Sequence, residues 1–393
     1  MPSLGLREWL AVGSVIASGK TVRYGDRKGP YTDRFEARLS EKMGVEYAHA
    51  VNSGTSALIC ALVGVGVGPG DEVLVPAYTW IATAAAVVSV GAVPVLVEID
   101  DSLTICPQDI ESKITANTKA IVPVHMINLP CDMDAIMAIA KKHGLLVVED
   151  ACQAVGVRYK GRRLGSIGDA GALSFNIYKN MNIGEGGAVL TNHKRVYQRA
   201  RMYHDVGCYI RGHEEPEEPV FVGQNFKATE FDSAILNVQL SKLDPHLDRL
   251  GRRRREMAKI ISASNQIALS RHNDPEDAVS LCATFGSVEE AETFANRRGV
   301  TRIFDSSRHI YTNWEPIVAR RTWHPMLNPW THAKRDVTYD ESTCPRTLDL
   351  LSRSCLISVT DKYPLPLMMY LAKTYVSAAE QIQRNTGPAA APA

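Results

Sequence analysis

The chain has 393 residues, of which 45% are hydrophobic and 22% charged, which is typical of a globular protein with a large core. Its formal net charge is +1, so no overall field would draw it to nucleic acid or to an anionic membrane. The eight cysteines are scattered, without a Cys-x-x-Cys pair or a histidine cluster at metal-ligand spacing. We therefore expect reduced thiols in a cytoplasmic protein, with no metal site and no nucleic-acid partner.

Two segments in the first hundred residues resemble a signal peptide or a membrane span. Residues 9–17 have the length of a signal-peptide core, but Glu8 interrupts the positive leader that such peptides carry, and an amphipathic helix is the better interpretation. Residues 73–97 carry no charge and are long enough to span a bilayer. Because Pro76 and Pro94 divide this run, the sequence predicts a strand, a helix and a strand, and no membrane segment.

From about residue 47, short apolar runs alternate with helical patterns, which is typical of a mainly parallel sheet covered by helices. The clearest helix begins after Asp132, a good N-cap residue, and ends at Gly144. Seven strands are expected, at Ala48–Val51, Val73–Val75, Val95–Ile99, Ala120–Val124, Leu145–Val148, Ala172–Asn176 and Ala188–Thr191. The fold class is therefore α/β, with a mixed seven-stranded sheet.

A long helix is expected from Thr229 to Ser262, bent or broken at Pro245, and the sequence beyond it is less regular α+β. We place the domain boundary along this helix. The expected parts are an N-terminal helix in residues 1–25 that packs on the small domain, a large domain in residues 26–250, a smaller α+β domain in residues 251–386, and a disordered Pro- and Ala-rich tail in residues 387–393.

The stretch from Ser174 to Gly187 predicts a strand, a loop that presents Lys179, and a glycine-rich turn into a second strand. A lysine held between two apolar strands is partly desolvated, which favours its neutral form. A neutral lysine amine is a nucleophile that forms Schiff bases with carbonyl compounds. Taken alone, a loop lysine is more often a solvated surface charge.

Two further segments have the composition of a cofactor site. Asn52 to Leu58 lies between a strand and a helix, and its small residues Gly54 and Thr55 suit a phosphate at the helix N-terminus, although helix capping explains them equally well. Trp80 follows another strand, where its ring can stack on a flat cofactor or pack in the core. Each segment is ambiguous by itself.

Two acidic or polar segments complete the set. Asp150 lies two residues after the apolar run 145–148. A carboxylate there is costly to bury unless it meets a cation, a protonated ring nitrogen or a helix N-terminus. Asn225 lies just before the long helix, where capping is the alternative. A phosphate cradle, an aromatic ring, a buried aspartate and a loop lysine together match the needs of pyridoxal 5′-phosphate (PLP), whose aldehyde would meet Lys179 and whose pyridine nitrogen would meet Asp150.

At these residues the chain resembles the DegT-type PLP enzymes, which include sugar and aminocyclitol aminotransferases. The resemblance runs from about residue 30 to 243 and rests on Asn-Ser-Gly-Thr at 52–55, Pro-x-Tyr-Thr-Trp at 76–80, Glu-Asp-Ala-x-Gln at 149–153, Ser-Phe-x-x-x-Lys at 174–179 and Gly-Glu-Gly-Gly at 184–187. It implies PLP fold type I and a homodimer with shared active sites. The implied roles are the Schiff base for Lys179, the pyridine nitrogen for Asp150, the ring hydroxyl for Gln153, stacking for Trp80, the phosphate for Gly54, Thr55 and Ser174, and the partner subunit's phosphate for Asn225.

The implied activity is transfer of an amino group from glutamate or glutamine to a keto-sugar, a keto-cyclitol or a related secondary-metabolite ketone. Other carbanion chemistry, such as dehydration, is an alternative, but sugar dehydratases of this family replace the lysine with histidine, and Lys179 is present. A regulatory homologue without catalytic activity is the other alternative.

The chain departs from the family pattern in two places. His125-Met-Ile-Asn128 replaces a glycine-containing segment, which changes a wall near the cofactor. The C-terminal third does not match the pattern of nucleotide-sugar enzymes, so a small ketone is favoured over a nucleotide-linked sugar. Aromatic and basic side chains there could meet the acceptor: Arg308, Tyr311, Trp314, Arg320, Arg321, Trp323 and His324. Each aromatic residue alone is better explained by packing in the core of the small domain.

Overall fold

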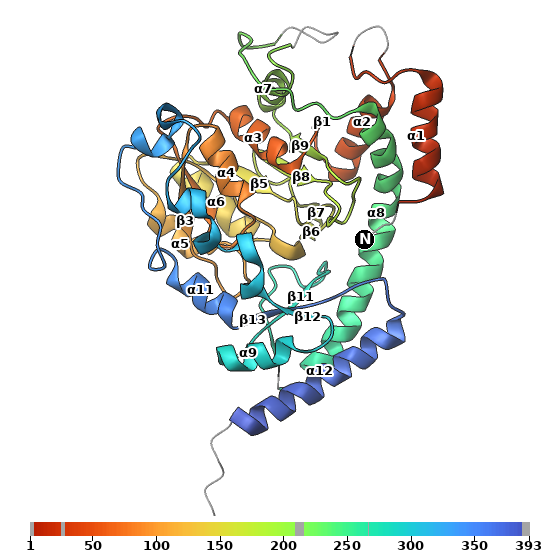
Figure 1. Ribbon diagram of the computed structural model, residues 1–393, viewed down its shortest axis with the longest axis vertical. Coiled ribbons are helices and arrows are strands. Elements are labelled where there is room, and N and C mark those ends of the chain that lie inside the picture. The colour runs from red at the N-terminus through yellow and green to blue at the C-terminus, as the bar shows by residue number, and fades with distance from the viewer. Residues whose placement is uncertain (1–3, 25–27, 209–215, 266, 387–393) are drawn as a thin grey trace, which may run out of the picture.

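The computed structural model describes residues 4–24, 28–208, 216–265 and 267–386. The tail at 387–393, for which disorder was predicted, lies outside these residues. A large α/β part and a smaller antiparallel sheet lie one below the other in Figure 1, and one long helix, α8, runs along both.

The large part is built on a seven-stranded sheet in the order β1-β9-β8-β5-β4-β2-β3. Only β9 runs against its two neighbours, and the other pairs are parallel. This confirms the predicted mixed, mainly parallel sheet. The strands are β1 Tyr47–Val51, β2 Glu72–Pro76, β3 Val93–Val97, β4 Thr118–Ile121, β5 Leu146–Asp150, β8 Ala170–Ser174 and β9 Gly187–Thr191, with a separate hairpin of β6 Arg158–Tyr159 and β7 Arg162–Arg163.

Helices surround this sheet: α2 Tyr31–Met43, α3 Gly54–Val65, α4 Ala82–Ser89, α5 Pro107–Lys113, α6 Met133–His143 and α7 Lys194–His204. Helix α6 has the predicted ends, because the Asp132 side chain accepts a hydrogen bond from Ala135 N at 3.2 Å and Gly144 adopts φ 65°. Helix α3 is apolar on nearly every side, as expected for a helix that packs between α7, α4 and the strands β8 and β9.

The uncharged residues 73–97 form most of β2, then α4, then β3, as predicted. Within the described ranges, none of the helices combines the length and the apolar character that crossing a membrane requires.

Helix α8 (Glu230–Ser262) continues through Pro245, so of the two predicted outcomes, a bend or a break, the break does not occur. A proline inside a helix costs about 3 kcal/mol, and packing against α1, α2 and α12 (Leu365–Thr386) offsets this cost. The helix begins with a capping box between Thr229 and Asp232.

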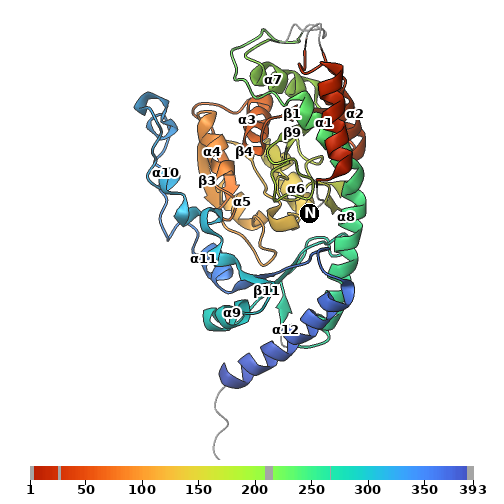
Figure 2. The same ribbon diagram turned by 45° about the vertical axis from the view of Figure 1, so that its right-hand side comes forward.

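The N-terminal helix α1 (Leu6–Ser18) differs from its prediction, which placed it on the small domain. It packs on the first half of α8, where the buried carboxylate of Glu8 pairs with Lys242 and accepts a hydrogen bond from Gln239 at 2.8 Å. Figures 1 and 2 both show α1 beside α2, at the end of α8 away from β11 and α12. A buried carboxylate requires such partners, and α8 supplies them here.

The smaller part consists of an antiparallel sheet in the order β10-β11-β13-β12, covered by α9 and α12. Its elements are β10 Ala268–Leu269, β11 Leu281–Thr284, α9 Val288–Ala295, β12 Val300–Arg302 and β13 Ser354–Ile357. Its core is a separate hydrophobic cluster that includes Phe294 and Tyr375.

The segment between β12 and β13 packs with the large core, although it falls in the predicted small domain. It contains α10 Glu315–Val318, α11 Pro345–Ser352 and several short 3-10 turns, and its buried Tyr311 and Trp314 belong to the large cluster. The domain limits given by the sequence stay a prediction.

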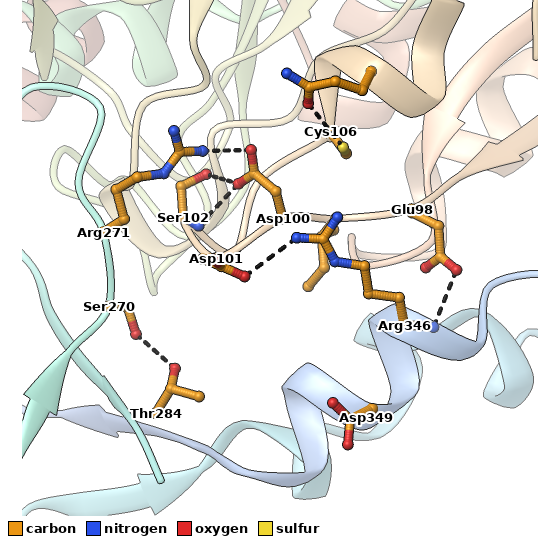
Figure 3. Close-up of polar contacts among 12 residues, drawn as sticks. Glu98, Asp100, Asp101, Ser102, Cys106, Ser270, Arg271, Thr284, Arg346 and Asp349 are labelled. Carbon is orange, nitrogen blue, oxygen red and sulfur yellow. Dashed lines mark hydrogen bonds and ion pairs between the residues drawn. The ribbon is translucent and has the colours of Figure 1, made fainter. Parts of the chain in front are cut away.

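A polar joint connects the loop after β3 with the small part (Figure 3). The buried Asp100 accepts hydrogen bonds from Ser102 N at 2.8 Å and from Ser102 Oγ at 2.6 Å, and it also pairs with Arg271. Arg346, from α11, lies 3.2 Å from Asp101 and donates its backbone N–H to Glu98 at 3.0 Å. The Asp100–Arg271 pair links the small part to this loop, and Arg346 links α11 to the same loop.

Candidate active site

A cavity of about 880 Å³ lies where the carboxyl ends of the parallel strands face the small sheet. The ends of such strands are the usual ligand site in open α/β folds. The cavity is lined by seven of the eight predicted site residues: Gly54, Thr55, Trp80, Asp150, Gln153, Ser174 and Lys179. Asn225 is the one that does not line it.

The N-terminus of α3 forms one end of the cavity. Ser53 caps the helix by accepting a hydrogen bond from Ser56 N at 3.1 Å. The backbone N–H groups of Gly54 and Thr55 have no acceptor among the described residues, and the hydroxyl of Ser174 lies close by. Free N–H groups at a helix N-terminus, joined by hydroxyl groups, suit a phosphate.

The backbones in this region approach so closely that two glycines are required. A Cβ atom on Gly54 would lie 2.7 Å from the Cβ of Ser174 and 3.1 Å from the sulfur of Cys152. A Cβ atom on Gly187 would lie 2.3 Å from the carbonyl oxygen of Ser53. Glycine is therefore necessary for α3 to begin directly against strands β8 and β9.

Asp150 ends β5, and its carboxylate is buried and held on both oxygens. Oδ2 accepts a hydrogen bond from the hydroxyl of Thr83 at 2.8 Å, and Oδ1 accepts one from Cys152 N at 3.1 Å. The Thr79 hydroxyl lies 2.8 Å from that of Thr83, whose proton is already donated to the carboxylate, so Thr79 is the donor to Thr83. This fixes the orientation of Asp150 and satisfies part of its charge.

The loop that carries Lys179 is anchored at both sides of the lysine. Lys179 N donates to Asn176 O at 2.9 Å, and the Asn180 side chain donates to Asn128 Oδ1 at 2.7 Å and to Val155 O at 3.0 Å. Lys179 itself is half-buried in the cavity wall.

The cavity environment changes the pKa values of two neighbours of Lys179. Burial and the charge of Asp150 hold the pKa of the Cys152 thiol well above its ordinary value, although the charge of Lys179 opposes this. Burial lowers the pKa of His309, and the charge of Lys179 lowers it further. The lysine thus lies close to both groups, and Cys152 stays a neutral thiol.

The departure from the family pattern at 125–128 lines the cavity. Ile127 and Asn128 adopt φ values of 45° and 64°, and the first is strained because a β-branched residue disfavours this region. Ile127 N donates to Gln153 Oε1 at 3.2 Å, which leaves the amide nitrogen of Gln153 free to donate elsewhere. At the place where a changed wall was expected, two residues with left-handed backbone conformation line the cavity, and the first of them orients Gln153.

A buried acid–histidine pair lies behind Asp150. His125 accepts a hydrogen bond from Cys131 N at 3.1 Å through Nδ1, so Nε2 carries the proton and donates it to Glu149 at 3.0 Å. Burial opposes ionisation of Glu149, but His125 and the N–H groups of Gly165 and Gly168 outweigh it and hold its pKa below the ordinary value. The pair fixes the loop after β7.

The small part supplies the opposite wall, which is mostly apolar and includes Leu250, Val279, Leu356 and Val359. The C-terminal aromatic side chains considered for the acceptor lie elsewhere. Tyr311 and Trp314 are buried, but they pack in the large core and not in the core of the small domain as the packing alternative predicted, and Trp323 is 85% exposed. Of the segment 308–324, His309 is the residue that lines the cavity.

Two residues at or beside the cavity were not predicted from the sequence. Thr83 holds Asp150, and its signal was its spacing from Thr79, because residues four apart share one face of a helix or turn. His309 packs against Trp80 with ring centroids 5.1 Å apart. No local pattern indicated this contact, which depends on tertiary pairing.

Asn225 lies outside the cavity, with its side chain exposed. Its backbone pairs with Asp205, and its Oδ1 accepts a hydrogen bond from Lys227 N at 3.4 Å. Nearby, Val222 is 88% exposed.

The fold is similar to that of known aminotransferase structures. 3-Amino-5-hydroxybenzoic acid (AHBA) synthase is 27% identical, with a TM-score of 0.79, over 97% of this chain and 98% of that chain. S. venezuelae DesV in complex with a ketimine intermediate is 29% identical, with a TM-score of 0.74, over 96% of this chain and 94% of that chain. The PLP-form of a putative sugar aminotransferase, Spr1654 from Streptococcus pneumoniae, has a TM-score of 0.77 over 97% of this chain and 98% of that chain, at 23% identity.

The sequence pattern of one enzyme family extends over most of the chain. The family model for DegT/DnrJ/EryC1/StrS aminotransferases matches residues 11–356, from the first helix to the last strand of the small sheet. This range includes every residue that lines the cavity except the last three, 357–359. The lysine loop, the aspartate at the end of β5 and the small residues at the start of α3 all lie within it. The chain therefore belongs to the DegT/DnrJ/EryC1/StrS aminotransferase family.

Proposed function

We propose that this protein is a PLP-dependent aminotransferase that moves an amino group from glutamate or glutamine to a keto-sugar, a keto-cyclitol or a related ketone. The single observation that carries the proposal is the cavity that holds Lys179, Asp150 and the free N–H groups of α3 together. Family membership and the PLP-form of one structural neighbour support the cofactor.

The residues present fit PLP at each of its functional groups. The close approach at Gly54 leaves a cradle of N–H and hydroxyl groups for the phosphate. The buried Asp150 carboxylate suits a protonated pyridine nitrogen, and the free amide nitrogen of Gln153 suits the ring hydroxyl. When bound, PLP acts as an electron sink for a carbanion next to the substrate nitrogen.

The chain's own side chains then have distinct tasks. The Lys179 amine would hold the cofactor through its carbonyl group and, when free, would carry a proton to and from the substrate carbon. Asp150 keeps the pyridine nitrogen protonated, and Thr83 and Cys152 N keep the carboxylate oriented. Trp80 covers one side of the cofactor ring, and the apolar wall from the small part limits the entry of water.

The wall composition supports a small, uncharged acceptor. Apart from Lys179, the described residues that line the cavity include neither lysine nor arginine. A nucleotide-linked sugar carries a diphosphate, which usually binds to arginine or lysine side chains. The proposed acceptor is therefore a free ring ketone.

The proposed assembly is a homodimer in which Asn225 of one subunit reaches the phosphate site of the other. The exposed Asn225 lies outside its own cavity and is therefore available to a partner. Apolar surface near both regions, with Val222 88% and Tyr178 78% exposed, supports an interface there. Mixing Lys179→Ala with Asn225→Ala subunits tests it, because half of the sites in a mixed dimer are intact.

After confirmed subunit exchange, the mixture should recover activity that neither parent shows. No recovery after exchange would contradict the shared site.

The test of the activity is spectroscopic. The purified protein should show the absorbance band of lysine-bound PLP, and glutamate or glutamine should bleach it, because the amino group is transferred to the cofactor. Addition of ring ketones should then restore the band. A protein that binds no PLP, or whose band no amino donor bleaches, would contradict the proposal.

A further inference from the structure

One wall of the cavity carries an imidazole without an assigned task. His309 lines the cavity, and its ring lies against Trp80, with centroids 5.1 Å apart and planes at 51°. The charge of Lys179 reaches it closely enough to affect its pKa. His309 therefore lies in the cavity wall, close to Lys179.

The backbone around His309 is held to the large part at three points. Thr79 N donates to His309 O at 2.9 Å, Ile81 N donates to Arg308 O at 3.2 Å, and Tyr311 N donates to Ala77 O at 3.1 Å. The indole N–H of Trp314 adds a bond to Arg308 O at 2.7 Å. The segment that carries the imidazole is thus hydrogen-bonded to the loop that carries Trp80.

The hydrogen bonds define which nitrogen of the His309 ring is the acceptor. Nδ1 lies 2.7 Å from Ser306 O, and because a carbonyl only accepts, Nδ1 carries the proton. Burial lowers the pKa of the ring, so it stays neutral near pH 7. Nε2 then has a lone pair, and it has no partner among the described residues of the chain.

We propose that Nε2 of His309 accepts a hydrogen bond from a ring hydroxyl of the acceptor and so selects polyhydroxylated rings over apolar ones. That the ligand is the amino acceptor rests on the proposed function. The capacity of Nε2 to accept a hydrogen bond does not, because it follows from the fixed ring and the proton on Nδ1. The hydroxyl-bearing residues Ser280, Thr301 and Ser358 also line this side, so loss of the His309 contact should weaken polyol binding without abolishing it.

Two substitutions separate the hydrogen bond from the packing of the ring. His309→Asn keeps a donor near Ser306 O and has no atom at the place of Nε2, whereas His309→Phe keeps a ring against Trp80 and has no nitrogen. The matched control is His324→Asn, at an exposed histidine that lies outside the cavity.

The probes are unreactive, so that binding is measured without turnover. Titration of the PLP-loaded protein with myo-inositol, methyl α-D-glucopyranoside and cyclohexanol, followed by ligand-observed NMR, gives a Kd for each. We expect both His309 variants to bind the better polyol ~3- to 10-fold more weakly than the wild type, with cyclohexanol unchanged. The control variant should bind all three probes as the wild type does.

Wild-type affinity for the polyols in either His309 variant would overturn the inference, as would a wild-type protein that binds neither polyol. Loss of cyclohexanol binding together with polyol binding would assign the effect to ring packing and overturn it too. If instead no amino donor bleaches the wild-type band while the polyol result is as expected, the proposed function fails and the His309 contact stands.

Discussion

The two walls of the cavity differ in how they are built. The wall at the sheet consists of short motifs, each placed at the end of one strand or the start of one helix, and its polar groups are held by local hydrogen bonds, as with Asp150 and Thr83. The wall from the C-terminal third is mostly apolar, and its one imidazole, His309, is placed by pairing with a loop more than two hundred residues earlier in the sequence. In the proposed function, the first wall binds the cofactor and the second wall contacts the substrate.

This difference indicates that chemistry and substrate choice can be changed separately. Substitutions in the sheet wall should remove cofactor attachment or the reaction itself, whereas those in the C-terminal wall should change which ligand binds. The predictions below test this separation, beginning with the largest effect.

Lys179→Ala should leave a folded protein and lower transamination by ~10⁴-fold or more, because both covalent attachment and proton transfer depend on this amine. Borohydride reduction followed by peptide mapping checks the attachment site. The matched control is Lys160→Ala, at an exposed lysine paired with Asp134, which should keep full activity. Cofactor mapped to Lys160 or Lys194 would show that the assignment is wrong.

Asp150→Asn should keep PLP bound but lower turnover by ~10²-fold or more, because an amide does not hold a proton on the pyridine nitrogen. Steady-state kinetics and the absorbance spectrum measure the two effects separately. Asp134→Asn, at an exposed site, serves as the control. Near-native turnover in the Asp150→Asn protein would contradict the role.

Most of the sheet wall could be predicted because its signals are local. The strand at 145–148 and the carboxylate that follows it, or the small residues of 52–55 before an apolar helix, show their place from neighbours in the sequence. All seven expected strands formed, and the seven residues assigned to the cofactor on this chain line one cavity.

The rest depended on contacts between distant segments. Helix α1 packs on α8, where Glu8 pairs with Lys242. The sequence around either residue does not indicate that the two would pair. Tyr311 and Trp314 were candidates for contact with a sugar ring, but both are buried in the core. His309, which contacts Trp80, was not predicted as a site residue. Aromatic residues suit both uses, so composition alone does not separate them.

Gly54→Ala should weaken PLP binding by about tenfold, because the new Cβ would meet the Ser174 Cβ at 2.7 Å and displace the phosphate cradle. Fluorescence titration of the apoprotein with PLP measures the Kd. Gly68→Ala is the matched control, since its Cβ would meet nothing within 4 Å. Equal affinities in the two variants would mean that the close approach at α3 does not matter for the cofactor.

The smallest effect concerns the joint that holds the two walls together. Asp100→Ala removes a buried carboxylate and leaves Ser102 N–H and the Arg271 guanidinium without their partner. The free energy of unfolding should fall by about 1–3 kcal/mol, most of it from the buried N–H group, because Arg271 is half exposed and its ion pair is screened by solvent.

Urea unfolding at a fixed protein concentration measures the change, since a dimer's stability depends on concentration. The neighbouring Asp101→Ala removes an exposed ion pair with Arg346 and should cost at most about 0.5 kcal/mol. If the joint only positions the small part, Asp100→Ala should also raise the KM for the acceptor while the bleaching by glutamate or glutamine stays unchanged, because that half-reaction depends chiefly on the sheet wall. An equal loss in both half-reactions would show that the two walls are not separable.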